Sequence, residues 1–130
     1  MARCIREHRG ECPACRSVHH TRLYTNDEWN WEDLLARHSL GWVIARDETR
    51  LVGFVNVVWD GMTHAWVQDT MVTRDQRDLG IGTEMMDLVR TECQKAGCEW
   101  LHVDFAEGLE AFYFRSCGFS PTPAGLMRLA

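Results

Sequence analysis

The chain has 130 residues and a formal net charge of −5. Hydrophobic residues make up 45% of it and charged residues 25%, which excludes a disordered chain. This length allows one sizeable core and is too short for two, so we expect residues 1–130 to form a single domain. Proteins that bind nucleic acid are usually basic, and the acidic balance therefore argues against DNA or RNA as the main partner.

The sequence predicts neither a signal peptide nor a membrane segment. The first ten residues include basic side chains, but no apolar stretch follows them. The longest apolar run, Leu51–Trp59, contains Gly53 and Asn56 and is too short to span a bilayer. We therefore expect a cytoplasmic protein with no membrane partner, whose cysteines stay reduced. Three cysteines lie in apolar patterns and are expected in the core: Cys93, Cys98 and Cys117.

Residues 1–25 have the least regular pattern and contain several Cys and His residues. The following segment predicts a helix. Asn26 or Asp27 can cap its start, an apolar stripe runs from Trp31 to Leu35, and Gly41 ends it.

Valine-rich and aromatic-rich runs come next and predict strands. They cover residues 41–47, 50–60 and 63–72. Short polar turns separate them, and one of these contains the pair Asp60-Gly61 that hairpins favour. The pattern therefore predicts an antiparallel meander.

The rest of the chain predicts a second set of elements. Apolar residues recur every three or four positions from Gly82 to Ala96, and Gly97 suits the end of that helix. A strand at 98–105, a short helix at 107–118 and a last strand within 120–129 complete the expected order. Pro121 and Pro123 limit where the last strand can pair. The expected fold class is α+β (mixed α/β), with one mostly antiparallel sheet faced by helices.

The stretch "RDLGIG", residues 77–82, lies between the third strand and the long helix. The first N–H groups of a helix have no partner within the helix and favour anions. Gly80 and Gly82 lack the Cβ atoms that would hold a phosphate away, and Arg77 adds positive charge. The local pattern thus favours a pyrophosphate site, while a tight turn that binds nothing is the alternative. It matches neither a Walker loop nor the dinucleotide fingerprint.

The wider stretch "MVTRDQRDLGIGTEMMDLVRTECQKAGCEWLHVDF…AFYFRSCGF" resembles the GCN5-related N-acetyltransferase (GNAT) superfamily. The family loop Arg/Gln-x-x-Gly-x-Gly/Ala is matched from Arg77 to Gly82, and the late aromatic pair before Gly118-Phe119 falls in family order. The resemblance covers Ser39 to about Leu129. It implies a GNAT-like fold in which two splayed strands hold acetyl-CoA as co-substrate.

By this resemblance, the backbone amides of residues 77–83 hold the pyrophosphate, and the end of the strand before the loop pairs with the pantetheine arm. The residues expected to contact acetyl-CoA are Met71, Val72, Thr73, Arg77, Asp78, Leu79, Gly80, Ile81, Gly82, Thr83 and Phe114. The implied reaction is direct transfer of an acetyl group to an amine, either a small molecule or a protein. Dimers are common in the family, which makes a homodimer a candidate assembly.

The chemistry needs a base for the amine, a donor to polarise the thioester and an acid for the leaving thiolate. Asp69 and Asp104 are the preferred bases, and Tyr113 is the candidate acid. The family often places that tyrosine four residues before the Gly-Phe pair, where this chain has Phe114. Tyr113 is its neighbour, and a packed core aromatic is the favoured interpretation of it.

Further candidates for the base are His64, His102 and Glu107. His102 and Asp104 alternate onto one face of their predicted strand. Trp59 and Trp66 flank the predicted hairpin, where they either wall an acceptor pocket or belong to the core.

Six residues crowd the first twenty positions: Cys4, His8, Cys12, Cys15, His19 and His20. The spacing of Cys12 and Cys15 suits zinc, but an irregular segment without metal is the favoured interpretation. Residues 17–24 could supply a first strand, or a partner subunit could supply what this short region lacks. Three functions therefore stay open: an acetyltransferase, a CoA-binding protein of the same fold without catalysis, and a zinc-bearing interaction domain.

Overall fold

The computed structural model describes residues 2–5, 31–48 and 50–130. Within these ranges the chain forms a five-stranded sheet in the order β1-β2-β3-β4-β5. The strands are β1 (Ala2–Ile5), β2 (Ser39–Asp47), β3 (Arg50–Trp59), β4 (His64–Val72) and β5 (Trp100–His102). The first four pair antiparallel with their neighbours, whereas β5 pairs parallel with β4. The expected α+β class with a mostly antiparallel sheet is confirmed.

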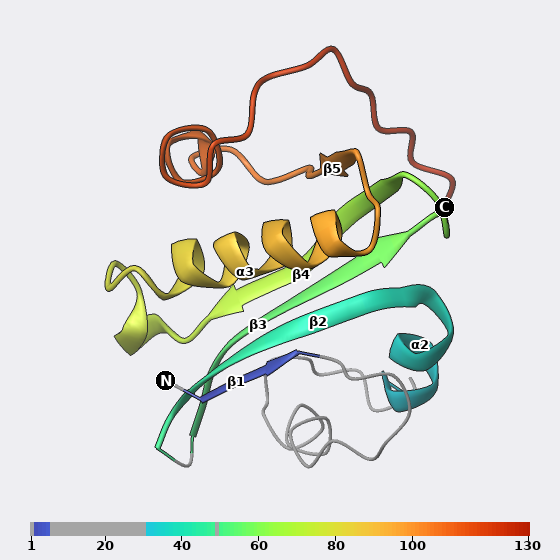
Figure 1. The fold of residues 1–130 in the computed structure, drawn as a ribbon. Coiled ribbons are helices and arrows are strands. Elements are labelled where there is room, and N and C mark those ends of the chain that lie inside the picture. Colours follow the sequence, from blue (N-terminus) through green and yellow to red (C-terminus); the bar gives the residue numbers. More distant parts are fainter. Residues whose placement is uncertain (1, 6–30, 49) are drawn as a thin grey trace.

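Helices cover both faces of this sheet (Figure 1). On one face lies α3 (Ile81–Lys95), which buries Met85, Met86, Val89 and Cys93 against strand valines. On the other face lies α2 (Trp31–His38), whose Leu35 packs with Trp42, Ile44 and Phe54. Because every second residue of a strand points to the same face, the strands divide their side chains between these two clusters.

The centre of the sheet is β3, in which every residue from Leu51 to Val57 is buried. A strand covered on both faces needs a continuous apolar run, as the sequence has here. Gly53 lies directly beneath α3, because a Cβ at this position would be 3.0 Å from Met85 Sδ. The missing side chain therefore lets the helix approach the sheet closely.

The hairpin between β3 and β4 is fixed by Asp60 and Gly61. The Asp60 Oδ1 atom accepts hydrogen bonds from the backbone N–H of Met62 at 2.7 Å and of His64 at 3.1 Å. These backbone bonds lower the pKa of Asp60. Gly61 has a φ of 81°, which glycine adopts without strain. The turn thus sets His64 as the first residue of β4.

The N-terminal part of the fold differs from the expectation at two points. β1 lies within the segment predicted to be irregular, and it pairs with the edge of β2, with Cys4 opposite Ile44. The alternative first strand at 17–24 lies outside the described residues. The helix predicted to end at Gly41 instead ends at His38. Ser39 already belongs to β2, where its buried hydroxyl donates to Asn56 Oδ1 at 2.6 Å.

The C-terminal part is less regular than predicted. Among residues 120–130 there is no strand, and Leu126, Met127 and Leu129 are 91%, 80% and 90% exposed. Pro121 and Pro123 deprive this tail of two ladder donors. β5 has only three residues where residues 98–105 were predicted. The last helix, η2 (Ala111–Ser116), is a π-helix.

The expectation for the three later cysteines is met. Cys93 is buried, Cys98 and Cys117 are partly buried, and all three are free thiols. None of the helices in the described ranges is long and apolar enough to cross a membrane.

Candidate active site

The parallel strands β4 and β5 separate soon after they meet. They pair at three positions, the last of which is Trp66 with His102. Beyond this point β4 continues to Val72, while residues 103–106 have no strand structure. The splayed pair of strands implied by the sequence resemblance is therefore present.

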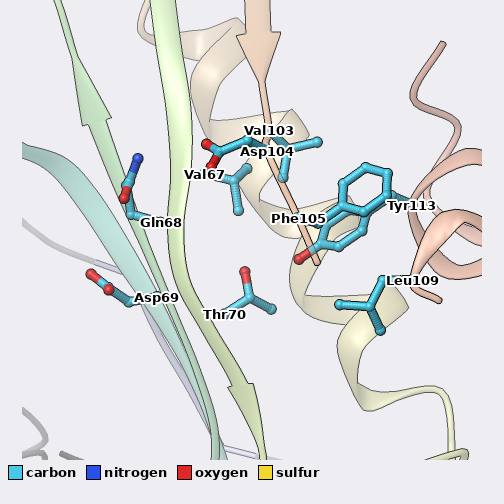
Figure 2. Close-up of a pocket in the computed structure, with 9 residues that line it drawn as sticks. All are labelled: Val67, Gln68, Asp69, Thr70, Val103, Asp104, Phe105, Leu109 and Tyr113. Carbon is cyan, nitrogen blue, oxygen red and sulfur yellow. The ribbon is translucent and has the colours of Figure 1, made fainter. Parts of the chain in front are cut away.

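A pocket of about 270 Å³ occupies the space between the separated segments. It is lined by Val67, Gln68, Asp69 and Thr70 of β4, by Val103, Asp104 and Phe105 after β5, and by Leu109 and Tyr113 (Figure 2). Consecutive residues of each segment contribute to the lining, although they point to opposite faces of the sheet. The pocket therefore passes between the two strands and is not confined to one face.

A bulge in β4 shapes the pocket wall. Phe54 pairs with Met71 but Asn56 pairs with Gln68, so β4 has one extra residue between these pairs. Asp69 has a φ of 55°, a left-handed conformation that is uncommon for a residue with a side chain. Bulges leave one residue outside the regular ladder and often lie next to active sites. The bulge thus turns backbone groups of Asp69 and Thr70 towards positions that a regular strand would not reach.

The two predicted bases occupy different parts of this pocket. Asp104 follows β5 and directs its carboxylate across the gap towards β4, whereas the Asp69 carboxylate points to the opposite side of β4 from Tyr113 (Figure 2). Asp104 is exposed and Asp69 is partly buried. The geometry therefore favours Asp104 as the carboxylate that a pocket ligand would meet. Glu107 lies in an exposed turn outside the pocket lining.

Tyr113 brings its hydroxyl into the pocket while its ring belongs to the core. The side chain is 5% exposed, and its ring stacks on Phe105 with centroids 4.5 Å apart. Burial raises the pKa of Tyr113, so the hydroxyl stays protonated at neutral pH. The hydroxyl points towards Thr70 Oγ1 (Figure 2), whose proximity opposes that rise without the geometry of a full hydrogen bond. Tyr113 is therefore a core aromatic that also lines the pocket, and its role as the acid stays a prediction.

The π-helical winding of η2 explains why Tyr113, and not Phe114, lines the pocket. The Cys117 N–H donates to the Phe112 carbonyl at 3.0 Å, a bond that spans five residues. An α-helix spans four and turns its side chains through a larger angle per residue. Phe114 packs edge-on against Phe105 at 5.3 Å and does not line the pocket. Counting back from Gly118 with α-helical geometry cannot reveal this rotation.

The glycine loop follows β4 by way of a short 3₁₀ turn, η1 (Arg74–Gln76). Arg77 Nε donates to the Val72 carbonyl at 3.2 Å and so ties the loop to the end of β4. Gly80 has a φ of 83° and precedes α3, which has no side-chain cap. The first amides of this 15-residue helix therefore lack an intrahelical partner at its positive end. That is the arrangement that favours an anion.

The two glycines of the loop have different roles in the structure. A Cβ at Gly80 would meet no atom within 4 Å, so this position needs glycine for its left-handed backbone. A Cβ at Gly82 would lie 2.9 Å from Phe112 Cζ. The sequence interpretation assigned both missing Cβ atoms to phosphate clearance. For Gly82 the structure adds a packing reason, because this residue contacts the helix that carries Tyr113.

The other residues predicted to contact the cofactor divide into two groups. Met71, Val72 and Thr73 are partly buried at the end of β4, and the Thr73 N–H donates to the Val52 carbonyl at 2.8 Å. The remaining loop residues lie on the surface around the start of α3. Arg77, Asp78 and Leu79 are exposed, and Ile81 and Thr83 are partly buried.

A histidine pair that sequence reasoning did not foresee lies beside the gap. His64 Nδ1 and His102 Nε2 are 2.7 Å apart, in a hydrogen bond between β4 and β5. Trp66 stacks on His102 with ring centroids 4.9 Å apart and on His64 at 6.0 Å. Each residue was a separate candidate in the sequence. The available signal was that His64 and Trp66 alternate along one predicted strand and that His102 lies on the next. Placing His64 beside His102 required the register between the two strands.

The proposed zinc cluster falls largely outside the described residues, since only the backbone of Cys4 belongs to a described element. In the described ranges, no group of three or more His, Cys, Asp or Glu side chains is arranged to hold a metal ion.

The sequence profile of the acetyltransferase (GNAT) family matches residues 3–119. The chain belongs to this family. GNAT proteins are acetyltransferase enzymes, and the match includes the glycine loop, both separated strands and η2. No curated protein sequence matches the chain.

Solved structures share the fold along nearly the whole chain. A GNAT-family acetyltransferase from Streptococcus pneumoniae superposes with a TM-score of 0.71 at 22% identity, covering 99% of this chain and 100% of its own. An aminoglycoside N-acetyltransferase, solved with a bisubstrate analogue of CoA, gives 0.75 at 15% identity, covering 100% and 99%. Glucosamine-6-phosphate N-acetyltransferase from Arabidopsis thaliana gives 0.71 at 15% identity, covering 98% of each chain. These superpositions support the GNAT fold.

Proposed function

We propose that this GNAT protein transfers an acetyl group from acetyl-CoA to an amine. One observation carries the proposal: β4 and β5 separate around a pocket lined by Tyr113, and the neighbouring Phe112 contacts the first turn of the uncapped helix α3. The pocket suits a thioester between two strands, and the helix end suits a pyrophosphate. The aminoglycoside acetyltransferase of the same fold was solved with CoA and with a CoA analogue, which supports this assignment.

In this proposal the loop and the start of α3 hold the cofactor. The amides from Arg77 to Thr83 receive the pyrophosphate, and the backbone of residues 71–73 pairs with the pantetheine arm. Arg77 contributes by fixing the loop through its bond to Val72 as well as by its charge. Phe114 supports the site from behind, through its contact with Phe105.

The pocket residues divide the chemistry. Acetyl-CoA supplies a thioester carbonyl that an amine can attack. Asp104 accepts a proton from the amine, and the backbone at the Asp69 bulge polarises the carbonyl. Tyr113 keeps its proton because its pKa is raised, and it donates this proton to the departing thiolate. The proposed acid is thus residue 113, one position before the place where the family often has its tyrosine.

A panel of primary amines, small molecules and peptides, incubated with acetyl-CoA tests the proposal by release of CoA thiol. We expect at least one amine to raise thiol release well above hydrolysis, and mass spectrometry to find that amine acetylated. Asp104→Asn should reduce the rate by about 10²-fold, as loss of a general base does.

The presence of Phe114 where the family often has a tyrosine favours one second candidate, a CoA-binding protein without catalysis. Tight binding of acetyl-CoA with no acetylated product from any amine would select it. With either function we still expect a cytoplasmic protein of one domain that has no nucleic-acid or membrane partner. For the acetyltransferase, the screen must identify the acceptor.

A further inference from the structure

The hydrogen bond between His64 and His102 limits how the two rings can carry protons. His64 Nδ1 and His102 Nε2 are 2.7 Å apart, so one nitrogen donates and the other accepts. In the neutral pair each ring has one proton. One of the two outer nitrogens, His64 Nε2 and His102 Nδ1, is therefore protonated while the other is a free base.

The pair lies at the closed end of the active-site gap. His102 belongs to the last residue pair before β4 and β5 separate. Strand alternation places His64, Trp66 and Gln68 on the face opposite α3, because Ala65 and Val67 pack into the α3 core. On β5 the same face carries His102, the last residue of that strand, and Asp104 follows in the irregular segment 103–106. Asp104 lines the pocket, and the histidines lie on the side of it where β4 and β5 still pair.

The rings are held in place by an aromatic wall and have few charged neighbours. Trp66 stacks on His102 at an interplanar angle of 17°. On β3, Val58 pairs with Trp66 and Asn56 pairs with Gln68. These two residues therefore lie on the same face of the sheet, and neither carries a charge. Two carboxylates flank the pair along the chain, Asp60 four residues before His64 and Asp104 two residues after His102.

Those carboxylates differ in position. Asp60 lies in the hairpin and accepts the His64 backbone N–H at 3.1 Å. Asp104 lies two residues beyond His102 and lines the pocket. Asp60 thus lies beside the start of β4 on the hairpin, and Asp104 lies beyond the end of β5 at the pocket.

We propose that the His102–His64 pair is a proton relay that removes the proton released by the acceptor amine. The inference rests on the proposed acetyl transfer. An ammonium group and a thioester give an amide, a thiol and one proton. That proton passes from Asp104, through water, to His102 Nδ1. The bridging proton moves from His102 Nε2 to His64 Nδ1, and the proton on His64 Nε2 leaves to solvent. One proton enters and one leaves. The relay resets through solvent: His64 Nε2 takes up a proton, the bridging proton returns to His102 Nε2, and His102 Nδ1 releases its proton to solvent.

His64→Gln tests the relay, because an amide can hydrogen-bond to His102 but cannot pass a proton on. With saturating acetyl-CoA and an amine that the wild type acetylates, kcat is measured from about pH 6 to pH 9, where histidine relays operate. We expect a loss of about tenfold or more at pH 7, with KM for acetyl-CoA unchanged. The loss should shrink towards pH 9, where more of the amine is already deprotonated. Added imidazole should restore part of the rate at pH 7.

His38→Gln is the matched control, because His38 is exposed at the end of α2. It should leave the pH profile unchanged. A second readout does not require turnover: NMR of the imidazole nitrogens should show one proton shared between the His64 and His102 rings in the wild type, and no proton shared between two rings in His64→Gln.

The outcomes separate the relay from the proposed function. If the wild type acetylates no amine, the proposed function fails and the relay fails with it. If the wild type is active and His64→Gln keeps the wild-type pH profile, the relay alone is wrong. A loss of equal size at every pH without rescue by imidazole also overturns the relay, since a purely structural role gives that result.

Discussion

Gly82 and Phe112 are in direct contact: a Cβ built on Gly82 would lie 2.9 Å from Phe112 Cζ and 3.0 Å from Cε2. Gly82 belongs to the first turn of α3, and Phe112 belongs to η2, the helix that carries Tyr113. The Phe112 and Tyr113 rings are themselves in edge contact, with centroids 4.8 Å apart. The Phe112 ring therefore contacts both the proposed pyrophosphate site, at Gly82, and the proposed acid, Tyr113.

Gly82→Ala should therefore displace η2 as well as disturb the loop. We expect a loss of about 1–3 kcal/mol in the free energy of unfolding, the usual cost of overpacking. Phe112→Leu removes the ring atoms that clash and should recover part of that loss in the double variant, measured by urea unfolding.

Gly80→Ala is the matched control. Its cost, about 1–2 kcal/mol for a left-handed alanine, arises from the backbone, because a Cβ there meets nothing within 4 Å. Phe112→Leu should not recover it. Equal recovery in both double variants would contradict the assigned roles of the two glycines.

Tyr113→Phe should lower kcat by about 10²-fold with little change in KM for acetyl-CoA, because the hydroxyl acts on the leaving group. Phe114→Tyr tests the register of η2. Adding this hydroxyl to the Tyr113→Phe variant should not restore activity, since residue 114 packs against Phe105 outside the pocket lining. Full activity of the double variant would show that η2 winds as an ordinary α-helix in solution.

Asp75→Asn should lower the melting temperature at pH 7 and should do so less as the solution is acidified. Asp75 Oδ2 accepts a hydrogen bond from Arg50 Nη2 at 2.6 Å, which lowers the pKa of Asp75 from 3.8 to about 2. A lowered folded-state pKa gives stability that is present above pH 3.8 and is lost as the pH falls towards 2.

The effect should be modest and sensitive to salt, because both side chains are about half exposed. Thermal melts of the wild type and the variant at several pH values measure it. A difference in melting temperature that stays constant from neutral pH to pH 2 would show that the pair acts through packing and not through charge.

Much of the fold is predictable from sequence because its signals are local. The valine-rich runs of β2, β3 and β4 and the apolar spacing of α3 are each visible within one segment, and their observed bounds differ from the predicted ones by two residues or fewer. The prediction of a strand in the tail was wrong. Three apolar residues form a strand only if they can pair with the edge of a sheet. β1 was missed because four residues that pair with an existing edge carry no periodic signal of their own.

The site was predictable where it depends on the order of residues and not where it depends on register. The glycine loop is a linear motif, and its place before α3 followed from the sequence. The bulge at Asp69, the bond between His64 and His102, and the π-helical rotation of Tyr113 each depend on how separate segments align or wind. A difference of one residue in register changes the direction of a side chain. The sequence could therefore name these residues but not orient them.

Cofactor binding by the glycine loop and α3 is tested most directly by calorimetric titration of the purified protein with acetyl-CoA. CoA and ATP serve as comparison ligands. Arg77→Glu removes the bond to Val72 and reverses the charge of the loop, and Arg74→Glu makes the same charge change on the neighbouring η1 turn. We expect the wild type to bind acetyl-CoA with micromolar affinity and not to bind ATP. Acetyl-CoA should bind at least about tenfold more weakly to Arg77→Glu than to Arg74→Glu, since about 1.4 kcal/mol of lost interaction is enough for that. Absence of acetyl-CoA binding by the wild type, or equal affinity in both variants, would contradict this prediction.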